Sequence, residues 1–240
     1  MGKKDKVLGY VIYDGPSKYD NKPIIAIAIM NSKNPKTSDM IQIYIMRKDI
    51  APHIAVKNGD DFSVCGKCPL RPISFKDNDI VDPCYVITWQ APLSIWNAFH
   101  RGRYEYATPE QFRLIIQEYN KPVRFGAYAD PACVPFEIWQ AMGIGSGEFN
   151  YTSYTHGYLM PNFDERLLAF SMLSLDQIND YKPELLNART YRVINSIDQI
   201  RQDEILCPAS KEQGYKTTCA KCGLCAGLSS KAKNIAIVSH

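Results

Sequence analysis

The sequence has little net charge and no long hydrophobic run. Its 28 Lys and Arg residues exceed its 25 Asp and Glu residues by only three, too few to argue for nucleic-acid binding from charge alone. No apolar run approaches the roughly 18 residues that span a bilayer, and the first residues lack the apolar stretch of a secretory signal. We therefore expect a cytoplasmic protein that does not enter a membrane.

Several catalytic signatures are also missing. The segment Gly143-Ile144-Gly145-Ser146-Gly147 is rich in glycine but lacks the lysine of a phosphate-binding P-loop. There is no Gly-x-Ser-x-Gly nucleophile elbow, no internal repeat and no low-complexity segment. An apolar fraction of 45% in 240 residues instead indicates a folded protein with a substantial core.

Eight cysteines are the most informative residues in the chain. In a reducing cytoplasm cysteines remain thiols, so disulfide pairing is the minority explanation. The cysteines fall into two groups whose short internal spacings are typical of metal ligands. We expect both groups to bind metal, as one or two iron-sulfur clusters or as zinc sites.

The first group consists of Cys65, Cys68 and Cys84. Three thiolates leave one coordination position open, as in a catalytic zinc with water or a four-iron cluster with one accessible iron. Alternatively, Cys133 or His53 supplies a fourth ligand and completes a structural zinc site. A lone Cys133 is also typical of a small residue buried beside a turn.

The second group consists of Cys207, Cys219, Cys222 and Cys225. Cysteines three positions apart on tight turns direct several sulfurs at one centre, and backbone amides stabilise the thiolate charge. Four sulfurs complete either a zinc knuckle or a saturated iron-sulfur cluster, and spacing does not separate these alternatives. His240 is an alternative ligand to Cys207.

The first part of the chain is rich in strands. Residues 8–13, 24–30 and 40–46 are predicted to form an antiparallel β-meander. A short helix over 50–56 follows and ends at Asn58-Gly59, a pair that favours left-handed backbone geometry. This part forms an N-terminal β-rich lobe.

Strands and helices alternate in the rest of the chain. The clearest helix begins at Thr108, where Pro109 and Gln111 complete a capping box ahead of an apolar stripe. The predicted helices cover 91–100, 108–119, 136–142 and 175–181. The predicted strands cover 86–89, 123–128, 151–156, 167–172, 190–194 and 234–238.

Parallel strands joined by helical crossovers explain this alternation. We predict an α/β fold with an N-terminal antiparallel β lobe over 1–60, an incomplete or closed (β/α) barrel-like body over 61–206, and a C-terminal cysteine knuckle with the last strand over 207–240. A doubly wound sheet is the alternative for the body. In either case ligands gather at the carboxyl ends of the strands, where Asp130 and His156 lie.

Short motifs follow one another in order along most of the chain. They are Gly15-Pro16-Ser17, Lys36-Thr37, Asp39-Met40, Cys65-Gly66-Lys67-Cys68-Pro69, Cys84-Tyr85-Val86, Ala91-Pro92-Leu93, Arg101-Gly102, Asp130-Pro131, Tyr154-Thr155-His156 and Cys207-Pro208-Ala209-Ser210. In this order they resemble a cysteine-cluster protein family encoded by phages and mobile elements. The resemblance implies a reactive cluster at the first cysteine group, an auxiliary one at the second, and action in the host cell cytoplasm.

The barrel-like alternation and the three-cysteine group are also similar to radical-SAM-like barrel proteins of phages. Those enzymes usually carry Cys-x3-Cys-x2-Cys in one loop, whereas Cys84 lies 16 positions after Cys68. The similarity makes S-adenosylmethionine a candidate cosubstrate. The resemblance further implies that Asp130, His156 and Arg192 face one cavity.

The resemblance suggests a role for each of these three side chains. Asp130 orients a substrate hydroxyl or amine, His156 transfers a proton, and Arg192 binds a carboxylate or phosphate. Each side chain also has a structural interpretation. An Asp before Pro often starts a turn, a strand histidine often bonds within the core, and Arg192 is compatible with an ordinary surface ion pair.

Two classes of function remain open. The first is an iron-sulfur enzyme that performs redox or radical chemistry on a nucleotide, nucleic-acid or peptide-like substrate. The second is a zinc-stabilised nucleic-acid-binding protein, whose surface mixes cations with aromatics around Trp96, Arg101 and Tyr104. The alternative for this surface is a helix whose Trp96 packs inward. A nucleobase-exchanging barrel enzyme with a structural zinc explains the second cysteine group but not the first.

Overall fold

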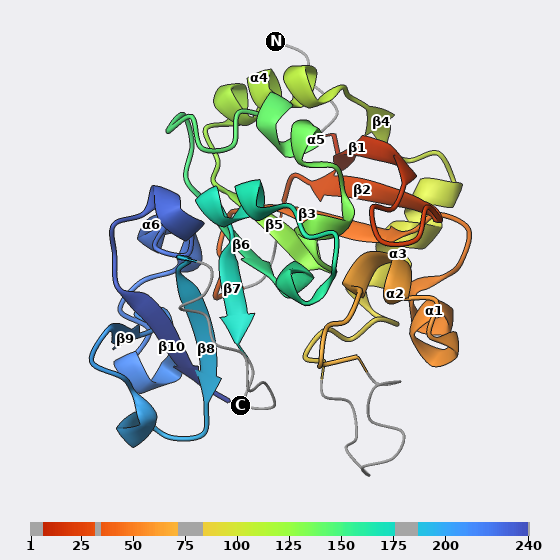
Figure 1. The fold of residues 1–240 in the computed structure, drawn as a ribbon. Helices are drawn as coiled ribbons and strands as arrows, with labels where there is room; N and C mark the ends of the chain where they lie inside the picture. Colours follow the sequence, from red (N-terminus) through yellow and green to blue (C-terminus); the bar gives the residue numbers. More distant parts are fainter. Residues whose placement is uncertain (1–6, 32–34, 72–83, 176–186, 240) are drawn as a thin grey trace.

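The computed structural model describes residues 7–31, 35–71, 84–175 and 187–239. In these ranges the chain forms one ten-stranded sheet with short helices around it (Figure 1). The strands are β1 (Gly9–Pro16), β2 (Pro23–Ile29), β3 (Ile41–Arg47), β4 (Glu105–Tyr106), β5 (Val123–Tyr128), β6 (Tyr151–Thr155), β7 (Met172–Leu175), β8 (Thr190–Ile194), β9 (Glu204–Leu206) and β10 (Asn234–Val238). The helices are α1 (Pro52–Asn58), α2 (Phe62–Cys65), α3 (Ala91–His100), α4 (Pro109–Tyr119), α5 (Phe136–Ala141) and α6 (Cys219–Cys222).

The sheet joins the two strand patterns that the sequence predicts. Its order is β4-β1-β2-β3-β5-β6-β7-β8-β10-β9. The strands β1, β2 and β3 pair in antiparallel fashion, which confirms the meander. From β3 to β9 every neighbouring pair is parallel, and β4 lies parallel to β1. The mixed α/β class is therefore confirmed, and the meander continues directly into the parallel strands.

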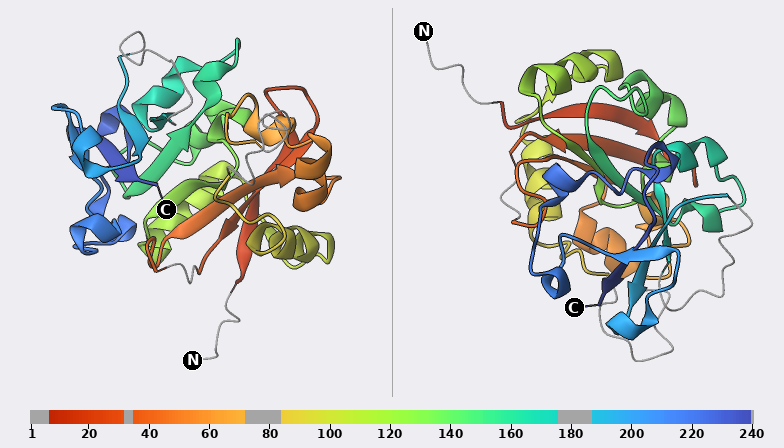
Figure 2. Two further views of the ribbon diagram at one scale, coloured as in Figure 1. Left: turned by 90° about the horizontal axis from the view of Figure 1, so that it is seen from below. Right: turned by 90° about the vertical axis from the view of Figure 1, so that its left-hand side faces the viewer.

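The strand β2 is buried on both faces because helices cover both sides of this part of the sheet. Ile24 and Ala26 belong to a hydrophobic cluster with residues of α4 and α5, whereas Ile25 and Ile27 belong to a cluster with residues of α3. This alternation follows the period of two in a strand. Figures 1 and 2 show α4 and α5 on one side of the meander and α1 to α3 on the other.

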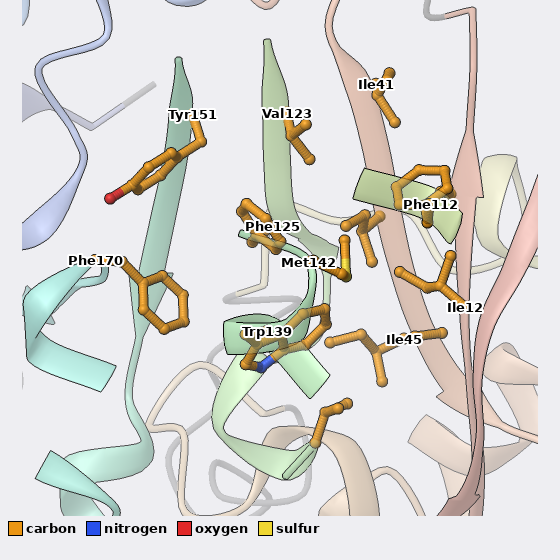
Figure 3. Packing of buried hydrophobic residues seen from close by; sticks show 14 of the residues in the cluster. Ile12, Ile41, Ile45, Phe112, Val123, Phe125, Trp139, Met142, Tyr151 and Phe170 are labelled. Atoms are coloured by element: carbon orange, nitrogen blue, oxygen red, sulfur yellow. The ribbon is translucent and has the colours of Figure 1, made fainter. Parts of the chain in front are cut away.

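Trp139 of α5 lies at the centre of the larger cluster (Figure 3). Its ring is fully buried and meets Phe125 of β5 edge-on, with ring centroids 5.3 Å apart. The indole N–H donates to the Pro131 carbonyl at 2.9 Å. Phe125 also contacts the rings of Tyr151 and Phe170, each with centroids 6.0 Å away. These aromatic contacts fix α5 against β5 and β6.

The helix α4 begins and ends as the sequence predicts. The Thr108 hydroxyl accepts a hydrogen bond from the Gln111 amide at 3.2 Å, and the Gln111 side chain accepts one from the Thr108 amide at 2.9 Å. Asn120, with a φ of 48°, ends the helix in the left-handed conformation. The predicted helix over 50–56 is likewise found as α1, which ends at Gly59 with a φ of 83°.

We expect Thr108→Ala to lower the free energy of unfolding by about 1 kcal/mol, because the substitution removes the acceptor for a helix amide. Urea unfolding followed by circular dichroism measures this change. Thr108→Ser is the matched control, since it keeps the hydroxyl, and it should stay within a few tenths of a kcal/mol of the wild type. Equal losses in both variants would show that the capping bond is not the source of the stability.

Two strand predictions are wrong. Residues 86–89 form an irregular segment and a turn ahead of α3. Within 167–172, a 3-10 helix occupies Glu165–Ala169, and β7 begins only at Met172. Short apolar runs do not distinguish a strand from another buried conformation.

The remaining differences concern short or partly described elements. The strands β4 and β9, which the sequence does not predict, contain two and three residues and lie at the two ends of the sheet. Of the predicted helix over 175–181, Leu175 instead ends β7 and the rest lies outside the described residues. No helix in the described part of the chain is long and apolar enough to cross a bilayer.

Candidate functional site

The Cys-x-x-Cys turn follows directly from the one-turn helix α2. Cys65 ends this helix, and the Cys68 amide donates to the Cys65 carbonyl at 3.0 Å. Gly66 adopts φ 55° and ψ −129°, a combination that only glycine takes without strain. A Cβ atom at Gly66 would lie 3.0 Å from the Met160 sulfur and 3.0 Å from the Tyr19 ring. Glycine therefore allows the turn that brings the two cysteines together.

Cys84 joins these two cysteines at one cavity of about 410 Å³. All three thiols are half-buried, and none of the eight cysteines of the chain is in a disulfide. The walls of this cavity, which we call the first cavity, also include His53, Val56, Lys57, Asp61, Leu70, Arg71, Val86, Ile87, Thr88, Trp89 and Tyr128. The structure thus brings together the three cysteines that the sequence assigns to one site.

A buried ion pair holds the cysteine turn in place. The Arg71 guanidinium contacts both carboxylate oxygens of Asp61, at 2.6 and 3.0 Å. It also donates to the carbonyls of Gly66 and Gly59, at 3.0 and 2.9 Å. Burial raises the pKa of the Cys65 thiol well above its ordinary value, and the nearby Asp61 carboxylate adds to this effect. Metal ligation is the usual means of holding such a thiol as the thiolate.

Two polar atoms in the first cavity have no hydrogen-bond partner among the described residues. They are the Nδ1 atom of His53 in α1 and the hydroxyl of Tyr128 at the end of β5. Buried polar atoms normally have partners, because leaving one unpaired costs about 1 to 3 kcal/mol. The two atoms are therefore available to a ligand. Cys133, the other candidate for a fourth metal ligand, is instead fully buried in the core beneath α5.

Asp130 and His156 lie together at the carboxyl ends of β5 and β6. The Asp130 carboxylate accepts hydrogen bonds from the Ala132 amide at 2.9 Å, the Thr155 hydroxyl at 2.7 Å and the His156 amide at 2.6 Å. Burial raises the pKa of Asp130, and these hydrogen bonds oppose the shift. The Asp130 amide also donates to the Val64 carbonyl in α2 at 2.9 Å. Asp130 therefore links two strand ends to the helix of the first cysteines.

Arg192 lies on β8, apart from these two residues. Its guanidinium pairs with Glu204 of β9 at 2.6 Å and donates to the Gln199 carbonyl at 2.6 Å. Burial raises the pKa of Glu204, but the hydrogen bonds and charges of Arg192 and Arg201 together outweigh this effect, so the pKa is lowered. None of Asp130, His156 and Arg192 lies in the wall of the first cavity. Their catalytic roles stay a prediction.

The second cysteine group surrounds a much smaller cavity of about 20 Å³, which we call the second cavity. Cys219 and Cys222 begin and end the helix α6, and Gly223, with a φ of 62°, reverses the chain toward Cys225. Cys207 lies in the same cavity wall. Burial raises the pKa of Cys225 to about 12, which the Tyr154 hydroxyl partly opposes. The volume suits a single ion, since it is close to that of one water-sized sphere.

Neither cysteine group forms a closed ligand shell. In the described ranges, no three His, Cys, Asp or Glu side chains are arranged so that they hold a metal ion as they stand. Metal binding at either site therefore requires side-chain rotation toward the centre of its cavity. His240, the alternative ligand at the second site, lies outside the described residues.

The sequence predicts the cysteines of the site but not its other residues. Asp61, Arg71, Tyr128 and Trp89 carry no motif of their own. Asp61 and Arg71 lie on either side of the Cys-x-x-Cys turn, and this position could have predicted their role. A charged pair beside a ligand loop often holds the loop in place.

Comparisons with family models, with curated proteins and with solved structures find no match for this chain. The resemblance to the phage and mobile-element cysteine-cluster family stays a prediction. Function is therefore argued from the chemistry of the site.

Proposed function

We propose that the protein is an iron-sulfur enzyme whose reactive cluster is held by Cys65, Cys68 and Cys84. The observation that supports this proposal is that three cysteines from two separate segments line one cavity of about 410 Å³. Three thiolates leave one iron of a four-iron cluster without a protein ligand. The cavity provides room for a substrate or cosubstrate at that iron, and S-adenosylmethionine is a candidate.

The other residues of the first cavity have roles that follow from their contacts. Asp61 and Arg71 hold the cysteine turn, as second-layer partners of metal ligands commonly do. The Tyr128 hydroxyl and the His53 Nδ1 atom bind polar groups of the ligand. Trp89 and the aliphatic side chains beside it give the cavity wall an apolar surface against which a ligand can pack. When bound, the cluster would transfer electrons from a cellular reductant for redox or radical chemistry on a nucleotide or nucleic-acid substrate.

In this proposal Cys207, Cys219, Cys222 and Cys225 hold an auxiliary metal centre. The body of the protein is barrel-like, with the carboxyl ends of the parallel strands directed toward the reaction site. We further propose that the protein is encoded by a phage or mobile element and acts in the host cell cytoplasm.

A zinc-stabilised nucleic-acid-binding protein is the second candidate. The small volume of the second cavity favours it, because about 20 Å³ suits one zinc ion better than a cluster of several atoms. Exposed aromatic side chains, among them Tyr85 and Trp89, are available for stacking on bases. This candidate leaves the larger first cavity without a role.

Metal analysis tests the two candidates directly. We expect protein purified without oxygen, from cells supplied with iron and zinc, to contain iron with a matching amount of acid-labile sulfide. It should absorb visible light and bleach on reduction. A colourless protein that contains zinc alone would contradict the enzyme proposal and favour the nucleic-acid-binding one.

A further inference from the structure

The side chain of Arg124 projects from the face of the sheet that α4 and α5 do not cover. In the strand register Arg124 of β5 lies beside Gln42 of β3 and Thr152 of β6. Its neighbours in sequence, Val123 and Phe125, point the opposite way into the core beneath α5. On the same face of the sheet, Tyr128 of β5 lines the first cavity and Thr152 of β6 lines the second, so Arg124 lies between the two cavities.

Arg124 is a cation without an acidic partner in the described part of the chain. Five other described arginines, namely Arg47, Arg71, Arg113, Arg166 and Arg192, pair with Asp or Glu side chains. The Nε atom of Arg124 is buried and has no hydrogen-bond partner among the residues that the structure describes. The titratable side chains near it include Tyr85, Tyr154, Tyr191 and Cys219, which are neutral hydroxyls and a thiol. A half-buried cation without a counter-charge among the described residues favours an anionic ligand, because withdrawing its charge from water is costly.

Tyrosine rings surround this guanidinium. Tyr154 and Tyr191 lie with ring centroids 4.6 Å apart and pack against the second cysteine group. Tyr85, next to Cys84 of the first group, is 72% exposed, and Arg124 is close enough to lower the pKa of its hydroxyl against the effect of burial. An exposed ring beside a cation is the combination that binds a nucleotide, since the ring stacks on a base and the cation holds the phosphate.

We propose that Arg124 and Tyr85 form a nucleotide-binding site between the two cysteine groups. Arg124 binds the phosphate through charge-assisted hydrogen bonds, and Tyr85 stacks on the base. This inference takes the class of substrate from the proposed function. It adds the two residues that recognise the nucleotide. The site binds its ligand without any covalent step.

Isothermal titration calorimetry with adenosine 5′-monophosphate tests the site, with adenosine and inorganic phosphate as partial ligands. Arg124→Gln should weaken binding of the nucleotide roughly tenfold or more and leave adenosine binding unchanged. Tyr85→Ala should weaken nucleotide and adenosine binding by roughly fivefold or more and leave phosphate binding unchanged. Arg113→Gln is the matched control, since it removes the same charge from an exposed pair on α4, and it should bind the nucleotide as the wild type does.

Two results would overturn the proposal. One is a wild-type protein, loaded with iron, that does not bind the nucleotide. The other is an equal loss of affinity in Arg113→Gln and Arg124→Gln, because it would indicate non-specific attraction. If Arg124→Gln does not fold, Tyr85→Ala decides the question, since the exposed ring makes little contribution to stability. Metal analysis of the same samples tests the iron-sulfur proposal separately. If the protein contains no iron, the titration still shows whether Arg124 and Tyr85 bind the nucleotide.

Discussion

Replacing Cys84 with serine is expected to remove the iron of the first centre while the protein stays folded. Cys84 lies in an irregular segment at the cavity wall and is only half-buried, so its thiol contributes little to the hydrophobic core. Loss of one of three thiolates leaves the cluster with too few protein ligands. Iron content and visible absorption should fall by the amount that the first centre contributes to the wild-type protein, and enzymatic activity should be lost.

Cys222→Ser should give the opposite result. Cys222 ends the helix α6 at the second cavity, in a segment that the proposed metal would stabilise. Free energy of metal binding at such a site is also free energy of folding, on the order of 10 kcal/mol in small zinc peptides. The thermal midpoint should fall in this variant, and a chelator should lower it in the wild type.

Cys133→Ala is the control for both cysteine variants. Its thiol is buried in the core and lies in the wall of neither cavity, so metal content should not change. Iron content, circular dichroism and thermal unfolding are measured on all three proteins. Equal unfolding of Cys84→Ser and Cys222→Ser would contradict the division into a reactive and a structural centre.

Removing one partner of the buried ion pair should produce the largest loss of stability among substitutions outside the cysteines. Asp61 and Arg71 are 2% and 9% exposed. Arg71→Ala leaves the Asp61 carboxylate buried without its counter-charge, and breaking such a pair costs about 3 to 5 kcal/mol. Urea unfolding of the wild type and the variant measures the difference.

A double variant tests whether the loss comes from the unpaired charge. Asp61→Leu combined with Arg71→Met replaces both charges with apolar side chains of similar size, and it should be more stable than Arg71→Ala alone. The exposed pair of Arg113 with Glu148 is the surface comparison, where Arg113→Ala should cost much less stability than Arg71→Ala because water screens the charges. Similar losses for Arg71→Ala and Arg113→Ala would show that burial does not strengthen the first pair.

Much of the fold is predictable because local signals specify it. The capping box at Thr108 and the left-handed glycine at Gly59 mark helix ends through contacts within a few residues. The apolar residues of β2 and β3 predict strands that are buried on both faces. Cysteine spacing likewise predicts which thiols line each cavity.

The rest depends on contacts between distant segments. The 3-10 helix over Glu165–Ala169 buries an apolar run that has no period to identify it. Arg71 and Asp61 are ten residues apart, and their pairing depends on how the chain folds around the turn between them. The unpaired hydroxyl of Tyr128 becomes visible only when its surroundings are known. Sequence patterns therefore predict the ligands better than the residues that support them.

The position of β10 between β8 and β9 sets an order for the synthesis of the protein. The strand β9 leaves the ribosome before β10, yet among the described strands β9 pairs with β10 alone. Glu204–Leu206 therefore stays unpaired in the nascent chain until Asn234–Val238 has emerged from the ribosome. Cys207 to Cys225 are translated during this interval, so the four thiols meet the metal pool of the cell before the last strand joins the sheet.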